Sequence, residues 1–167
     1  MKKLIAATAV ALACQAAPVV AGDAQERVQA SRQVVKSFFT ELKGELVHAM
    51  KNGGPVAAIA VCNAKAPGIA AGQSEQTGFE VGRTSLKLRN PDNAPHAWER
   101  AVLKDFEKRK AAGENPKKME YWEYVDGDFR YMKAIPTGDV CLKCHGSSIA
   151  APVAAKLDEL YPDDQAR

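Results

Sequence analysis

Apolar residues recur at three- and four-residue steps through residues 23–50, and charged residues fill the other side. The apolar stripe consists of Val28, Val35, Phe38 or Phe39, Leu42, Leu46 and Met50. This spacing predicts one long amphipathic helix near the N-terminus. Gly53 and Gly54 are expected to end it, and Pro55 suits the first turn of a second helix over residues 56–65. The second helix is apolar nearly all round, so we expect it to be buried.

The helical periodicity breaks at Pro67 and Gly68, and a short helical piece over residues 69–73 is expected to follow. Residues 79–86 alternate between apolar and polar side chains, which predicts a strand, although its internal glycine weakens the pattern. Residues 89–95 are rich in turn-forming residues and predict a loop.

The last part of the chain mixes helix and strand signals. We predict a helix over residues 96–112, with Trp98 and Phe106 on its apolar face. Residues 119–124 and 129–135 are predicted strands, joined through an Asp-Gly hairpin turn. A final helix is predicted near the C-terminus, over residues from about 151 to 160. The element order indicates a single α+β domain in which a small antiparallel sheet is flanked by helices.

The N-terminus has the pattern of a secretory signal peptide. Two lysines precede an apolar run at residues 4–13, and small residues follow up to an expected cleavage site after Ala21. The run is too short to span a membrane, so we expect residues 22–167 to form one domain without an integral membrane segment. Lipoprotein processing at Cys14 is the alternative. Either route takes the chain out of the cytoplasm, and we predict the periplasm.

Composition narrows the possible partners. The chain has 167 residues, of which 46% are hydrophobic and 26% are charged, with 23 basic and 20 acidic residues. Removal of the two signal-peptide lysines lowers the formal net charge from +3 to about +1. This weak charge gives no reason to expect a nucleic acid or an anionic membrane as partner.

The motif Cys-Leu-Lys-Cys-His at residues 141–145 is the attachment signature of a c-type haem. The thiols of Cys141 and Cys144 would add to the two vinyl groups of one haem, and His145 would ligate its iron. The alternatives are a Cys-x-x-Cys redox pair or half of a zinc site. Zinc would need two further ligands, and no matching pair follows. We therefore expect one covalently bound haem c and its iron.

One cysteine remains unexplained. Cys14 would leave with the signal peptide and haem would use two others, so Cys62 is left as an odd thiol in an oxidising compartment. It is either a buried, inert side chain or a second iron ligand. The spacing alone does not decide between these roles.

The iron of a six-coordinate haem needs a ligand opposite His145. The candidates are Cys62, His48, His96, Met50, Met119 and Met132. The histidines also suit exposed or capping positions, and the methionines also suit the core. A methionine ligand would raise the reduction potential, whereas a thiolate stabilises ferric iron and lowers it.

Several segments together resemble a bacterial family of single-haem c-type proteins with a PAS-like fold. They are Ala-Val-Cys-Asn-Ala-Lys-Ala-Pro at 60–67, Val-Gly-Arg-Thr-Ser-Leu-Lys-Leu-Arg-Asn-Pro at 81–91, Asn-Ala-Pro-His-Ala-Trp-Glu at 93–99, the haem motif, and Tyr-Pro-Asp-Asp at 161–164. The family occurs as stand-alone secreted proteins and as haem sensor regions of histidine kinases and chemoreceptors. The resemblance implies a PAS-like α+β fold and Cys62 as the second axial ligand opposite His145.

The resemblance also covers the segment that contains Arg83 and Arg89. Arginine side chains suit the haem propionates, because a guanidinium fork matches a carboxylate. The alternative is that both arginines are ordinary surface residues.

Three classes of function remain. The first is a one-electron redox protein with a redox partner protein, and the second is a redox or gas sensor that acts through a separate partner. The third is a haem enzyme, such as a peroxidase or a nitrogen-oxide reductase. Two strong axial ligands would close the iron to substrates, so we favour redox function, with sensing second and no enzymatic activity. The sequence leaves the oligomeric state open.

Overall fold

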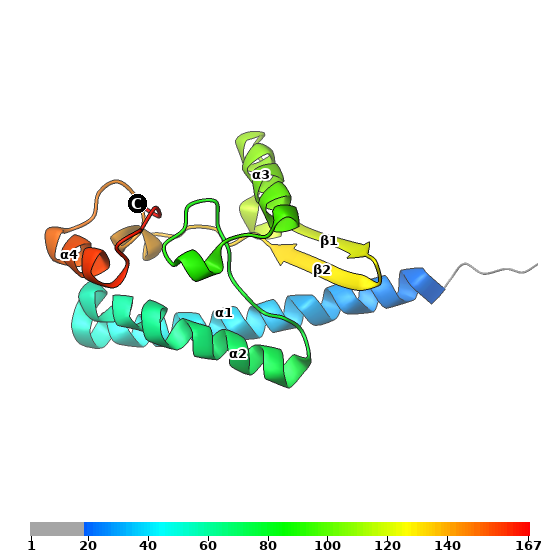
Figure 1. The fold of residues 1–167 in the computed structure, drawn as a ribbon, viewed down its shortest axis with the longest axis horizontal. Helices are drawn as coiled ribbons and strands as arrows, with labels where there is room; N and C mark the ends of the chain where they lie inside the picture. The colour runs from blue at the N-terminus through cyan, green and yellow to red at the C-terminus, as the bar shows by residue number, and fades with distance from the viewer. Residues whose placement is uncertain (1–18) are drawn as a thin grey trace, which may run out of the picture.

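The structure is a computed structural model, and it describes residues 19–167. Helix α1 (Val19–Ala60) runs along almost the whole molecule (Figure 1). It is kinked at Gly54, whose φ of 70° and ψ of −170° lie outside the helical region. Such a positive φ favours glycine. The predicted interruption at the Gly-Gly pair is therefore confirmed, and the expected signal peptide lies almost entirely outside the described residues.

The buried face of α1 confirms the predicted amphipathic pattern and corrects its detail. Before the kink its buried residues are Ala24, Val28, Ser31, Val34, Phe38 and Leu42, and beyond it they are Ala58 and Ile59. Phe38 is the core member of the Phe-Phe pair, because the side chain of Phe39 is 44% exposed. Val34 is buried more fully than Val35, the residue that the pattern predicted.

Helix α2 (Ala66–Thr77) lies beside α1 (Figure 1). Ala66 and Ile69 pack against Phe38 and Leu42 of α1. The predicted break at Pro67 and Gly68 is wrong. Pro67 lies in the first turn of α2, where a backbone N–H is not required.

The sheet is a hairpin of β1 (Glu120–Val125) and β2 (Asp128–Lys133). The Asp-Gly turn is confirmed, since Asp126 and Gly127 both have positive φ, at 54° and 91°. One face packs on α3 (Ala97–Ala111), where Val102, Phe106 and Met119 form a buried cluster.

The other face of the hairpin is tied to α1. Arg32 of α1 pairs with Glu120, and its Nε donates to a carboxylate oxygen at 3.0 Å. The hydrogen bond from Arg32 lowers the pKa of Glu120 to about 2. Tyr124 also donates to Asp23 at 2.7 Å. The hairpin is therefore held between α1 and α3, and the expected α+β architecture with a small antiparallel sheet is confirmed.

The strand predicted over residues 79–86 is wrong. Among the residues that the structure describes, the segment has no partner strand, and it forms its hydrogen bonds with side chains and loops. The backbone N–H of Val81 donates to Ser74 Oγ at 2.9 Å, and the Thr84 hydroxyl donates to the Asn93 carbonyl at 2.9 Å. The alternating pattern indicates an extended chain that lies partly against α2, because Val81 packs on the α1–α2 core.

Helix α4 (Ala151–Leu160) covers the end of α1 beyond the kink (Figure 1). Val153 and Leu157 of α4 bury Ile59 of α1, together with Tyr161. Cys144, from the predicted haem motif, packs against the same cluster. Within residues 19–167, no helix is long and apolar enough to cross a membrane.

Met119 tests the packing between α3 and the hairpin. Its side chain is 1% exposed, so Met119→Ala should lower the free energy of unfolding by about 2–5 kcal/mol because it leaves a cavity. Ile135→Ala is the control, since Ile135 is 55% exposed and the change should stay within about 0.5 kcal/mol. Urea denaturation measures both, and equal losses would contradict the assigned core.

Candidate haem site

The Cys-x-x-Cys-His motif folds into a tight turn. Residues Cys141–Lys143 form a short 3₁₀ helix. The backbone N–H groups of Cys144 and His145 both donate to the Cys141 carbonyl, with N···O distances of 3.1 and 2.9 Å. Cys141 and Cys144 are both free thiols. The motif therefore presents two thiols and an imidazole from one compact turn.

Cys62 approaches this turn from the other half of the chain. It lies in a π-helical turn (Val61–Lys65) between α1 and α2, a rare conformation that is frequent at functional sites. Burial raises the pKa of the Cys62 thiol, Arg83 and Arg89 act to lower it, and Cys141 acts to raise it. Ile59, three residues before Cys62, belongs to the buried cluster against which Cys144 packs. The helix junction that carries Cys62 therefore meets the haem-motif turn.

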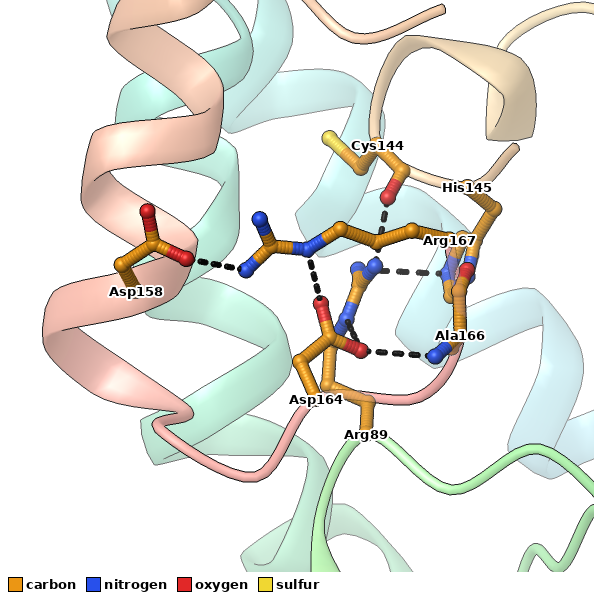
Figure 2. Close-up of polar contacts among 7 residues, drawn as sticks. All are labelled: Arg89, Cys144, His145, Asp158, Asp164, Ala166 and Arg167. Atoms are coloured by element: carbon orange, nitrogen blue, oxygen red, sulfur yellow. Dashed lines mark hydrogen bonds and ion pairs between the residues drawn. The ribbon is translucent and has the colours of Figure 1, made fainter. Parts of the chain in front are cut away.

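His145 is held with one nitrogen against the end of the chain (Figure 2). Its Nδ1 lies 3.2 Å from the carbonyl oxygen of Ala166. A carbonyl can only accept, so Nδ1 carries the hydrogen and Nε2 of the neutral ring holds the lone pair that could bind a metal. Arg89 Nη1 lies 3.5 Å from this Nε2. Burial and the charge of Arg89 lower the pKa of His145, and the hydrogen bond to Ala166 offsets part of this shift.

Arg89 joins the haem motif to the C-terminal residues (Figure 2). Its Nε lies 3.2 Å from Asp164 Oδ1, and its Nη2 donates to the Cys144 carbonyl at 2.5 Å. The Arg89 and Asp164 side chains are only 12% and 1% exposed. Burial alone would raise the pKa of Asp164, but hydrogen bonds from Ala166, Arg167 and Arg89 outweigh it, and the pKa is lowered.

Comparison with known proteins identifies the family. The Tll0287-like family model matches residues 15–167. The chain belongs to the Tll0287-like family. Its structure is similar to the crystal structure of the cyanobacterial heme-protein Tll0287, with a TM-score of 0.59 and 22% sequence identity. The match covers 87% of this chain and 84% of that chain. No curated protein matches the chain.

Membership of the Tll0287-like family confirms the resemblance drawn from the sequence motifs. The solved relative is described as a heme-protein, and its likeness to this chain shows that the two share a fold. That fold is the α+β arrangement that the motifs implied, here with two antiparallel strands.

The other candidate ligands have structural roles elsewhere. The exposed His48 has its Nε2 3.1 Å from the Asn52 amide. His96 begins α3 and forms a capping box with Glu99. Met119 and Met132 pack in the cluster between α3 and the hairpin. Met50 is half-buried on α1. Cys62 is therefore the candidate that the fold brings to the haem motif.

Three site residues were missed in the interpretation of the sequence. Asp164 and Ala166 contact Arg89 and His145, and Tyr161 is buried beside them, with its ring centroid 6.0 Å from the Arg89 guanidinium carbon. Burial raises the pKa of Tyr161, and a hydrogen bond with Asn63 offsets part of the shift. The Tyr-Pro-Asp-Asp motif carried this signal, because it belongs to the resemblance but had no assigned role.

The donor set fits a haem. The turn offers two free thiols and an imidazole with an available Nε2, and a third thiol lies near them. Arg83 has no ion-pair partner within the described part of the chain, so it is available to a propionate. Arg89 is already engaged by protein groups, yet its buried Nε has no well-aligned acceptor. Its contact with a propionate stays a prediction.

A cleft of about 440 Å³ lies beside this cluster. Asn63, Arg89 and Tyr161 line it, but Cys141 and His145 do not.

The buried pair of Arg89 and Asp164 generates a prediction. Arg89→Gln should lower the free energy of unfolding by about 3–5 kcal/mol, because it leaves the buried Asp164 carboxylate without its buried cation. Arg167→Gln is the matched control. Arg167 pairs with the same carboxylate but is 31% exposed, so its loss should cost about 1 kcal/mol or less. Denaturant unfolding compares the two, and similar costs would argue against the buried pair.

Proposed function

We propose that this protein is a monohaem c-type cytochrome-like protein that serves one-electron redox in the periplasm. Haem is held covalently through Cys141 and Cys144, and the iron is ligated by His145 and Cys62. The observation that carries the proposal is that the helix junction with Cys62 and the haem-motif turn with Cys144 meet at one buried cluster. Membership of the Tll0287-like family supports it.

Each side chain has a distinct task in this proposal. The two motif cysteines fix the ring, and His145 presents Nε2 because Nδ1 is occupied by the Ala166 carbonyl. Cys62 supplies an anionic sulfur that favours ferric iron. Arg83 neutralises a propionate. Bound haem would supply a ferric–ferrous couple for one-electron exchange with a partner protein.

The two axial ligands also bear on the class of function. With His145 and Cys62 bound, a substrate finds no open position on the iron, which favours electron transfer over catalysis. The periplasmic location rests on the signal sequence at residues 1–21.

Cys62→Ser tests the ligand assignment. The ferric wild-type protein should give the low-spin EPR spectrum of histidine–thiolate haem, and Cys62→Ser should abolish that spectrum because serine supplies no thiolate. Haem should stay covalently attached in the variant, since Cys141 and Cys144 are intact, and a pyridine haemochrome spectrum after denaturation checks this.

His48→Gln is the control for Cys62→Ser. His48 is a rival ligand by residue type, but it lies exposed beside Asn52, so this variant should keep the wild-type EPR spectrum. An unchanged spectrum in Cys62→Ser, or a changed one in His48→Gln, would overturn the assignment.

A haem-based sensor is the second candidate, and the π turn is the observation that favours it. Cys62 lies inside this turn, which joins α1 to α2, so release of its sulfur from iron would act directly on the junction of two helices. Carbon monoxide added to the ferrous protein separates the two functions. Formation of a stable adduct with altered amide exchange around residues 61–65 supports sensing, whereas no adduct supports electron transfer alone.

A further inference from the structure

The C-terminal residues make one contact that the proposed function does not require. The Ala166 carbonyl oxygen lies 3.2 Å from His145 Nδ1 (Figure 2). A hydrogen bond from the remote nitrogen of a metal-binding imidazole fixes the orientation of its ring. The same bond increases the electron donation of the imidazole to the metal.

Polar contacts centred on the buried Asp164 carboxylate hold the Ala166 carbonyl in place. The Ala166 backbone N–H donates to Asp164 Oδ1 at 2.9 Å, and Arg167 Nε donates to the other oxygen of Asp164 at 3.0 Å. Arg89 Nε lies 3.2 Å from Oδ1, and Gln165 N–H donates to the Leu88 carbonyl at 2.7 Å. The Asp164 side chain that accepts the first of these bonds is only 1% exposed. Asp164 therefore acts as the anchor of the segment.

The anchor is also joined to the haem motif itself. Arg89 contacts Asp164 and at the same time donates to the Cys144 carbonyl. Arg167 extends outward to Asp158 of α4, where its Nη2 donates at 2.6 Å. Movement of the C-terminal segment would therefore disturb the residue that precedes His145 as well as His145 itself.

We propose that residues 161–167 form a positioning element for the iron-binding histidine. In this element, Asp164 anchors the Ala166 carbonyl on His145 Nδ1 and thereby lowers the reduction potential. The inference rests on the proposed function, because it needs iron on His145 Nε2. The Nδ1–H···O=C bond makes the imidazole a stronger donor, which stabilises ferric more than ferrous iron. Asp164 and Ala166 are positioning residues, because they act through His145 and neither is a ligand of the iron.

Two variants with matched controls test the proposal on the holoprotein. Asp164→Asn weakens the anchor, and Asp163→Asn makes the same chemical change at an exposed neighbour. Ala166→Pro removes the N–H that Asp164 accepts without changing any charge, and Ala166→Ser keeps that N–H. The measurement is the ferrous-to-ferric ratio at fixed solution potentials, followed by absorption spectroscopy.

Asp164→Asn and Ala166→Pro should each raise the ferrous-to-ferric ratio at least tenfold, which corresponds to about 59 mV for a one-electron couple. Both controls should stay near wild type. All four variants should keep the low-spin EPR spectrum, which shows that the iron ligands are retained. If Asp164→Asn shifts the potential and Ala166→Pro does not, the effect is one of charge alone and the proposal is overturned. No shift in either variant also overturns it.

The wild-type holoprotein allows a test that needs no variant to fold. Pulsed EPR of the ferric protein should detect an exchangeable, hydrogen-bonded proton on the remote nitrogen of the axial imidazole, and a free N–H would contradict the proposal. A failure of the proposed function itself would give a different result from a failure of this inference. Wild-type protein would then carry no covalent haem, or would lack the histidine–thiolate spectrum.

Discussion

The apolar cluster of Ile59, Val153, Leu157 and Tyr161 is the contact on which the proposed site depends. Ile59 lies one helical turn before Cys62, and Cys144 packs against the same cluster. Leu157, with no exposed surface, lies at its centre. Burial of these side chains therefore brings together the two halves of a site that lie far apart in the sequence. Without α4 the π turn and the haem motif would share no core.

The buried ion pair of Arg89 and Asp164 makes this packing specific. Apolar contact is not directional, whereas the Arg89–Asp164 pair fixes which groups meet. Arg89 donates to the motif backbone, and Asp164 holds the segment whose carbonyl meets His145. A buried ion pair of this kind adds little net stability, because both charges lose their hydration. Its value at this site lies in the orientation of the imidazole.

Much of the architecture could be predicted from the sequence, because its signals are local. The stripe on α1, the Gly-Gly interruption, the Asp-Gly hairpin and α4 each follow from spacing or turn chemistry, and the structure has all of them. Two predictions failed for physical reasons. Residues 79–86 alternate as a strand does, but within residues 19–167 no strand pairs with them. Pro67 does not break the helix, because the chain passes through a π turn and restarts at Ala66.

The candidate site was predictable in its residue types but not in its supporting contacts. The haem motif is explicit, and the unpaired Cys62 drew attention by cysteine arithmetic. Asp164 and Ala166 were not predictable in the same way. A backbone carbonyl has no sequence signature, and the residue type alone does not separate Asp164 from its exposed neighbour Asp163. Such contacts are non-local, so they become visible only when the fold is known.

The central claim is that one iron lies between His145 and Cys62. Iron K-edge X-ray absorption of the ferric holoprotein tests it most directly, because it identifies the atoms bound to the metal. The account predicts one sulfur beside the porphyrin and imidazole nitrogens, and predicts its loss in Cys62→Ser. A shell of nitrogens alone in the wild-type protein, or a sulfur that persists in Cys62→Ser, would contradict the account.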